Sequence, residues 1–174
     1  EFALDVLLKV GVAGNMVVYT GKAQPVEDAF ASIIPYLDPN ELVYYYNNVG
    51  GYYESVAWFV EGAWHFYGVM IPYGVYWIAV TQDCTWTYGV EETPPSSVQL
   101  YSGRTNLVAY SGPSQSVEAA FASIFAYLLL LYYYDPDEGW LTPSTMISNT
   151  AYGVQVDRDC VWYFVGMLEF EPGS

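Results

Sequence analysis

The sequence predicts an α+β, β-rich fold made of two pseudo-symmetric β-β-α-β-β-β repeats that pack together. Three observations carry this prediction: an internal repeat in the chain, strand-like runs rich in tyrosine and tryptophan, and one apolar helical face in each copy. The 174 residues suffice for two small repeats with a sizeable shared core. We expect the first copy at residues 1–89, a linker at 90–97 with two prolines, and the second copy at 98–174.

The repeat consists of four pairs of matching segments that occur in the same order. They are Asn15–Gly21 with Asn106–Gly112, Val26–Ile33 with Val117–Ile124, Tyr44–Tyr46 with Tyr132–Tyr134, and Asp83-Cys84 with Asp159-Cys160. The offset falls from 91 to 88 and then to 76 residues along the chain. The first copy therefore carries about a dozen extra residues, which we place in an aromatic insert within residues 47–73.

Each copy opens with two predicted strands and a helix. The strands are expected near residues 5–10 and 15–20, and near 98–101 and 106–111. Pro25 suits the first helical position, and Glu27 and Glu118 fall in the first turn, where the helix dipole favours an acid. The apolar helical face comprises Val26, Phe30, Ile33, Ile34 and Leu37 in the first copy, and Val117, Phe121, Ile124, Phe125 and Leu128 in the second.

The remaining elements of each copy are strands. One strand ends in each tyrosine triplet, and the penultimate and last strands lie near 76–81 and Cys84, or near 152–157 and Cys160. The nearly apolar stretch 119–134 is too short to span a bilayer as a helix, so we interpret it as a core helix followed by a buried strand at 128–134. Asp135–Gly139 has the composition of a turn.

Composition excludes several classes of protein. Four Lys and Arg oppose 19 Asp and Glu, which gives a formal net charge of −15. So few cations disfavour nucleic acid and anionic membrane surfaces as partners. With 53% apolar residues the chain is not disordered. High acidity together with abundant tyrosine is typical of an extracellular or cell-surface protein.

Four segments carry a family resemblance: Asn106–Gly112, Val117–Ile124, Tyr132–Leu141 and Tyr76–Trp86. They resemble a repeat of secreted and surface-layer-associated proteins of bacteria and archaea, over most of both copies. The resemblance implies an extracellular, non-catalytic module and brings no catalytic residues with it. The chain departs from the family pattern where aromatic and apolar residues replace polar ones, as in Phe125–Leu131. A diverged relative and an engineered binding variant both explain this.

Few residues suggest catalytic or metal chemistry. The single histidine, His65, lies in a strand-like aromatic run, where a stacked or partly exposed side chain is the ordinary role. Cys84 and Cys160 have three possible roles: buried free thiols, a disulfide, or reactive groups. The acids of Asp135–Gly139 resemble a fragment of a calcium loop, but a simple acidic turn explains them as well. We therefore expect no catalytic residues, no bound metal and no cofactor.

The aromatic insert is the most distinctive candidate for a binding surface, because the second copy lacks it. Tyrosine and tryptophan provide large contact areas with few rotatable bonds. The candidate ligand-binding residues are Tyr52, Tyr53, Trp58, Trp64, His65, Tyr67 and Tyr73. The leading hypothesis is a non-catalytic binding module for a protein or an apolar or aromatic small ligand. The alternatives are a structural module that self-associates, and an enzyme with an aromatic pocket around His65.

Overall fold

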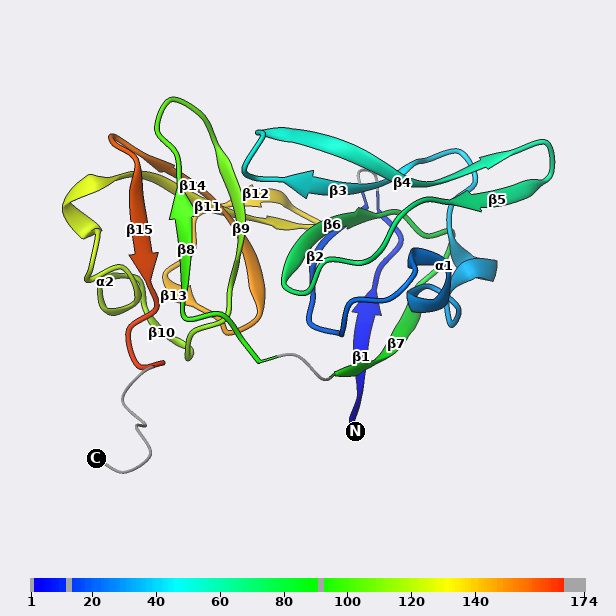
Figure 1. Ribbon diagram of the computed structural model, residues 1–174, viewed down its shortest axis with the longest axis horizontal. Helices are drawn as coiled ribbons and strands as arrows, with labels where there is room; N and C mark the ends of the chain where they lie inside the picture. Colours follow the sequence, from blue (N-terminus) through cyan, green and yellow to red (C-terminus); the bar gives the residue numbers. More distant parts are fainter. Residues whose placement is uncertain (1, 12–13, 91–92, 168–174) are drawn as a thin grey trace.

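The computed structural model describes residues 2–11, 14–90 and 93–167, which form two halves that lie side by side (Figure 1). The first half contains β1 (Phe2–Leu8), β2 (Asn15–Tyr19), α1 (Val26–Ala29), η1 (Ile34–Tyr36), β3 (Val43–Asn47), β4 (Tyr52–Val60), β5 (Ala63–Phe66), β6 (Gly74–Ile78) and β7 (Cys84–Val90). The second contains β8 (Ser97–Leu100), β9 (Asn106–Tyr110), β10 (Gln115–Ser116), α2 (Val117–Ala120), η2 (Phe125–Tyr127), β11 (Leu128–Asp135), β12 (Gly139–Leu141), β13 (Thr145–Met146), β14 (Thr150–Val156) and β15 (Cys160–Tyr163). The fold is β-rich, and each half has more strands than the β-β-α-β-β-β plan predicts.

The strand order is the same in both halves. The large antiparallel sheet of the first half runs β2-β6-β3-β4-β5, and that of the second runs β9-β14-β11-β12. In each half the first strand pairs with the last, β1 with β7 and β8 with β15. β5 is the extra strand of the first half. It forms a hairpin with β4 that projects from the end of the molecule (Figure 1).

The helices are shorter than the sequence predicts. α1 ends at Ala29, and the chain continues through turns into the 3₁₀ segment η1. There the backbone N–H of Tyr36 donates to the carbonyl oxygen of Ile33 at 2.8 Å, three residues back. Pro35 lies in this segment and lacks an N–H, so it offers no hydrogen bond to continue an α-helix.

The predicted apolar face is nevertheless mostly buried. Val26, Phe30, Ile33 and Leu37 lie in the core of the first half. In the second half Phe121 and Ile124 are buried in the same way. The exception is Phe125, which was expected on the buried face and is exposed.

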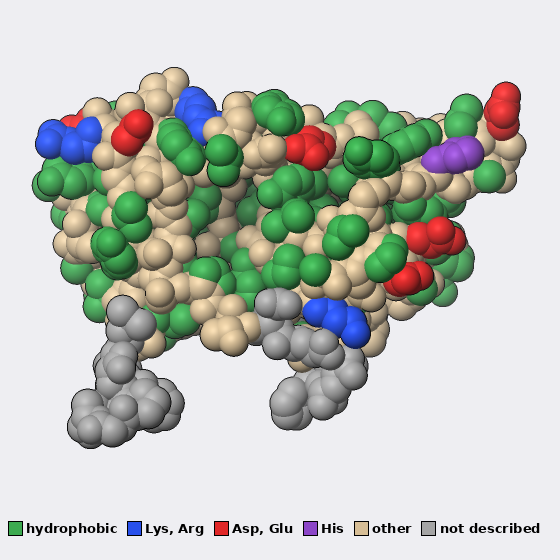
Figure 2. All heavy atoms as spheres, in the orientation of Figure 1, with side chains coloured by type: hydrophobic (Ala, Val, Ile, Leu, Met, Phe, Trp, Pro, Cys, Tyr) green, Lys and Arg blue, Asp and Glu red, His purple; other side chains and the backbone are tan. Residues whose placement is uncertain are grey.

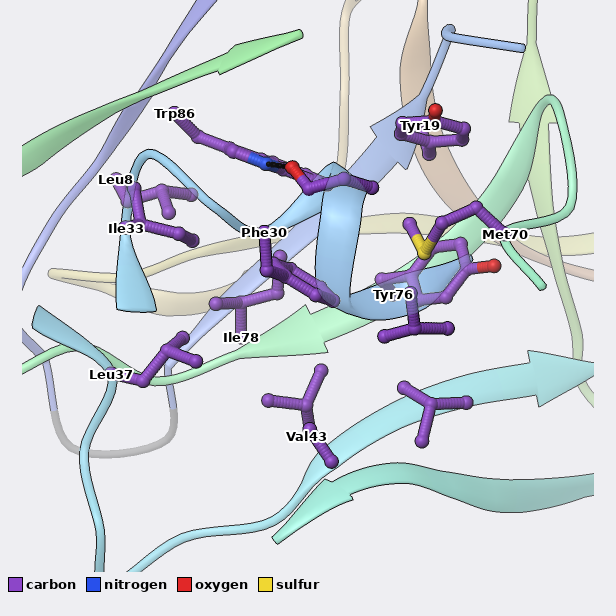
Figure 3. Packing of buried hydrophobic residues seen from close by; sticks show 14 of the residues in the cluster. Leu8, Tyr19, Phe30, Ile33, Leu37, Val43, Met70, Tyr76, Ile78 and Trp86 are labelled. Carbon is purple, nitrogen blue, oxygen red and sulfur yellow. Dashed lines mark hydrogen bonds between the residues drawn. The ribbon is translucent and has the colours of Figure 1, made fainter. Parts of the chain in front are cut away.

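A buried tryptophan joins each helix to the outer strand pair. The indole Nε1–H of Trp86 donates to the carbonyl oxygen of Ala29 at 2.7 Å, and its ring stacks on Phe30 with centroids 5.0 Å apart (Figure 3). Trp162 repeats both contacts, with the carbonyl oxygen of Ala120 at 2.9 Å and with Phe121 at 4.0 Å. The donors thus stay paired although both indoles are fully buried.

A buried asparagine closes the turn between the first two strands of each half. Asn15 Nδ2 donates to the carbonyl oxygens of Lys9 and Ile78, and Asn15 Oδ1 accepts from the Lys9 N–H. Asn106 makes the same three bonds, with Tyr101 and with the carbonyl oxygen of Val154. The sequence repeat therefore corresponds to a repeat of buried hydrogen bonds.

The two halves meet through the faces of their large sheets that point away from each half's own core. Val18, Tyr46 and Val75 of the first half pack against Leu107, Ala109 and Ala151 of the second in a separate buried cluster. This contact buries apolar faces that would otherwise be open to water.

Polar contacts extend the join between the halves. Arg104, between β8 and β9, donates to the carbonyl oxygens of Asn48 and Val49 in the β3–β4 turn. Gly51, at φ +78°, permits this approach, because a Cβ there would overlap the guanidinium.

The strand predicted as buried at 128–134 exists as β11 but is not buried, since Leu129 and Leu130 are exposed on its surface. Both cysteines are free thiols and half-buried, so the disulfide alternative is not realised. Residues 91–92 of the linker lie outside the described residues.

No helix within the described residues is long and apolar enough to cross a membrane. In the stretch 119–134, predicted as a core helix followed by a buried strand, the structure has the end of α2, the 3₁₀ segment η2 and most of β11.

Replacing Asn106 by leucine should lower the free energy of unfolding by about 2–4 kcal/mol, because three backbone groups of Tyr101 and Val154 lose their partners. Asn15→Leu should have a comparable effect, and the exposed Asn40→Leu should change it by less than about 0.5 kcal/mol. Urea unfolding followed by tryptophan fluorescence measures all three. Equal stabilities of Asn106→Leu and Asn40→Leu would contradict this role.

Candidate functional site

An aromatic groove lies between the two halves, and we call it the inter-repeat groove. Its main cavity has a volume of about 750 Å³. The lining residues that we use below are Glu41, Tyr44, Tyr53, Trp77, Tyr134 and Trp140. A neighbouring cavity of about 340 Å³ shares Tyr53 and Trp140 with it.

The two-residue period of β-strands decides which tyrosines reach the groove. In β3, Tyr45 packs on its own core, while Tyr44 and Tyr46 are on the opposite face of the sheet. In β11, Tyr133 packs on its own core, and Tyr132 and Tyr134 line the cavities between the halves. Each triplet therefore contributes its two outer rings to the space between the halves. These rings come from the shared scaffold, since both copies carry the triplet.

Each half also contributes aromatic rings that pack across neighbouring strands at the groove, including one directly opposite pair. Tyr46 in β3 lies opposite Tyr53 in β4, with ring centroids 4.9 Å apart. Tyr134 in β11 lies opposite Trp140 in β12, with centroids 5.2 Å apart. Both pairs are edge-to-face, which is a favourable arrangement for ring quadrupoles.

Trp77 of β6 connects the aromatic residues of the two halves. Its ring lies 4.9 Å from that of Tyr134 and 6.0 Å from that of Trp140, at 67° and 74°. Its indole Nε1–H donates to the Tyr53 hydroxyl at 3.2 Å. Burial raises the pKa of Tyr53, and the hydrogen bond from Trp77 partly offsets that rise.

The position of Trp77 differs between the halves. Trp77 lies opposite Tyr44 in the β3–β6 pair, and Gly153 lies opposite Tyr132 in the β11–β14 pair. A Cβ at Gly153 would overlap the Tyr132 ring, so the tyrosine lies directly over this glycine. A tryptophan in one copy and a glycine in the other make the groove asymmetric.

A polar network lies beside the second cavity. The Tyr46 hydroxyl of the first half donates to the carbonyl oxygen of Thr105 at 3.1 Å. The Thr105 hydroxyl is 2.9 Å from the Tyr132 hydroxyl and accepts from Gln155 Nε2 at 2.9 Å. Thr105 thus couples the first half to β11 and β14.

The structure does not bring the seven sequence-predicted site residues together. Among them only Tyr53 lines the inter-repeat groove. Tyr52 and Tyr67 are exposed, and Trp64 packs against the core of the first half. Tyr73 packs on the cluster between the halves and lines a separate cavity of about 240 Å³.

His65 lies on the projecting hairpin, where it stacks on Trp58 with ring centroids 6.2 Å apart. Figure 2 shows this histidine near the end of the molecule, and it shows the surface hollowed between the two halves with hydrophobic side chains around the hollow. The histidine is thus well separated from the region between the halves.

Five residues of the groove lining were not predicted as site residues from the sequence: Glu41, Tyr44, Trp77, Tyr134 and Trp140. One signal was available for Trp77. Aligning the copies at the cysteine offset places Tyr76-Trp77-Ile78 on Tyr152-Gly153-Val154, where only Trp77 breaks the pattern.

Neither cysteine lines the groove. No group of three or more His, Cys, Asp or Glu that could hold a metal ion occurs in the part of the chain that the structure describes. Partial burial raises the pKa of both Cys84 and Cys160, and nearby aspartates raise it further. These thiols therefore stay protonated at neutral pH and are poor nucleophiles.

Comparison with protein-family models, with curated proteins and with solved structures finds no match to this chain.

Replacing Thr105 by valine should remove the hydroxyl that Tyr132 and Gln155 share, and lower the free energy of unfolding by about 1–2 kcal/mol. Because Tyr132 packs on Trp140 at 4.9 Å, the tryptophan emission should also shift. Thr145→Val, at an exposed strand position, is the control and should leave both unchanged. A Thr105→Val protein with the parent's stability and spectrum would show that the network is dispensable.

Proposed function

We propose that this protein is a non-catalytic binding module of extracellular type that takes a small apolar or aromatic ligand in the inter-repeat groove. The main observation behind this proposal is the cavity of about 750 Å³ lined by aromatic rings from both halves. Cavities of roughly 300–1,000 Å³ lined mainly by apolar and aromatic side chains are typical of small-ligand sites. A concave site favours a small molecule over a flat protein partner.

The proposal includes the origin of the two halves. We infer that they are copies of one repeat, related by a pseudo-twofold axis, of the kind found in secreted and surface-layer-associated proteins. The recurring strand order and the paired asparagine and tryptophan hydrogen bonds support a common origin. The acidic composition supports an extracellular or cell-surface location.

Ligand binding in the groove should depend on Trp77 and Trp140. We expect at least one member of a panel comprising an indole, a naphthol, a sterol and a phenyl glycoside to raise the melting temperature. The affinity of that ligand should fall at least tenfold in Trp140→Ala, since one aromatic face is worth about 0.5–1.5 kcal/mol beyond its buried area. Trp77→Phe should weaken binding less, because a ring remains.

The matched control is Trp58→Phe, which changes a tryptophan on the hairpin outside the groove. It should bind like the parent in thermal shift and in fluorescence titration. A ligand that binds Trp140→Ala and the parent equally is bound elsewhere. A panel with no ligand that protects the fold counts against the small-ligand proposal.

Self-association is a second candidate function, and one observation favours it. In the first half β4 covers the whole length of β3, from Val43 to Asn47. In the second half β12 covers only residues 133–135 of β11. Pro143 follows shortly after β12 and cannot donate to a ladder. Within the described residues, Leu128–Tyr132 pairs with β14 on one edge and with no strand on the other.

The open edge of β11 suits a strand from a second copy of the chain. It carries no charged residue from Leu128 to Tyr134, and Leu129 and Leu130 are 60% and 53% exposed. The strand β5, which has no Asp, Glu, Lys or Arg, is the corresponding edge of the first half and lies at the far end of the molecule (Figure 1). Pairing of β5 with β11 of another copy is head-to-tail, so it would build open chains or closed rings of more than two copies.

Sedimentation over a range of concentrations tests this candidate. We expect a mass that grows beyond the dimer as concentration rises, and a monomer for Leu130→Lys, since a lysine on an edge strand opposes pairing. Leu7→Lys, at an exposed position of β1, should assemble like the parent. A parent protein that stays monomeric into the millimolar range excludes self-assembly through this edge.

A further inference from the structure

The lining of the groove's main cavity is acidic, while Arg104 lies beside Gly51 of the neighbouring cavity. Glu41 is the charged residue in the lining of the main cavity. The chain has four Lys and Arg, all within the described residues, and none of them lines this cavity. Lys9 pairs with Asp137 at 3.2 Å, and Arg158 pairs with Asp157 at 3.0 Å. With a formal net charge of −15, the field over the groove favours a cation.

The rings of the groove add to this preference. An aromatic ring has a negative face, which attracts an ammonium or guanidinium group within about 6 Å of its centre. Trp140 and Tyr53 are 48% and 47% exposed, so part of their ring surface is open to a ligand. The Trp77 N–H already donates to Tyr53, which leaves this donor occupied and unsuited to an anion.

The protein itself shows that its tyrosines accept cations in this way. The guanidinium carbon of Arg104 lies 4.6 Å from the centre of the Tyr101 ring. That of Arg158 lies 4.2 Å from the centre of the Tyr127 ring. Two of the four Lys and Arg thus rest on a tyrosine face, while the larger set of rings in the groove has no such cation.

From these observations we propose that the inter-repeat groove binds a small organic cation with an alkylated ammonium group. The ammonium group lies against Trp140 and its neighbouring rings, and Glu41 at the rim supplies the opposite charge. An alkylated ammonium suits the site because its methyl groups bury apolar surface while the charge meets ring faces. This inference rests on the proposed function of the groove and specifies its ligand class.

A comparison of choline with its uncharged carbon isostere, 3,3-dimethylbutan-1-ol, tests the cation preference, because the two have the same shape and differ in charge. We expect choline to bind at least tenfold more tightly in a titration followed by tryptophan fluorescence and calorimetry. Binding of choline should weaken as salt is added, since Glu41 is exposed. The isostere should show little dependence on salt.

Three variants assign the effect to residues. Trp140→Ala should reduce the affinity for choline at least tenfold. Trp140→Phe keeps an aromatic ring and should retain part of the affinity, so the pair of variants distinguishes the loss of a ring from the loss of the fold. Glu41→Gln should reduce it several-fold and flatten its salt dependence. Glu61→Gln, at the exposed tip of the β4–β5 hairpin, is the control and should bind choline like the parent.

The outcomes separate the two levels of the proposal. Equal or tighter binding of the isostere would overturn the cation preference and leave the groove as a site for neutral ligands. Binding of neither probe would also overturn it, and the ring-compound panel then decides whether the groove binds ligands at all. Choline affinity that is unchanged in both Trp140→Ala and Glu41→Gln would place the cation elsewhere and overturn the assignment.

Discussion

The contact between the two large sheets determines the rest of the architecture. It is made largely by small side chains, among them Val18 and Val75 from the first half and Ala109 and Ala151 from the second. Small residues let two sheets approach at the usual spacing of about 10 Å. Farther along the sheets, at β3, β4, β11 and β12, the facing residues are tyrosine and tryptophan. The sheets are in close contact where these small residues meet, and they are separated by the inter-repeat groove where the bulky rings lie.

The alternation of side chains along β3 and β11 determines which tyrosines reach the groove. Each tyrosine triplet gives its middle ring to its own core and its outer rings to the space between the halves. A single copy could not form the groove, because Trp77 comes from one half and Tyr134 and Trp140 from the other. The groove therefore needs both halves of the chain.

Much of the fold followed from the sequence, because it depends on local and periodic signals. The strands that contain the tyrosine triplets, the acidic turn at Asp135–Gly139 and the strands that carry the cysteines were all predicted. Helix length was overestimated, since apolar spacing does not distinguish an α-helix from an α-turn followed by a 3₁₀ segment, and Pro35 was not taken as its end.

The site was harder to predict because it depends on pairing across the chain. The excess of aromatic residues in the insert directed attention to the hairpin, where Trp58 stacks on His65 away from the groove. The residues that line the groove occupy scaffold positions, and only strand order shows that they meet. Trp77 was the detectable exception, since the other copy has Gly153 at its place.

A difference in length between the two halves explains both the half-exposed Trp140 at the groove and the open edge of β11. Between the tyrosine triplet and the buried methionine that follows it, Met70 or Met146, the first copy has about a dozen residues more than the second. Those residues extend β4 and add β5, which completes the cover over β3. In the second copy the shorter chain stops β12 at Leu141, so that Trp140 stays half-exposed at the groove and the leucines of β11 keep an open edge. The second half therefore owes its half-exposed Trp140 and the open edge of β11 to the absence of a hairpin like β4–β5.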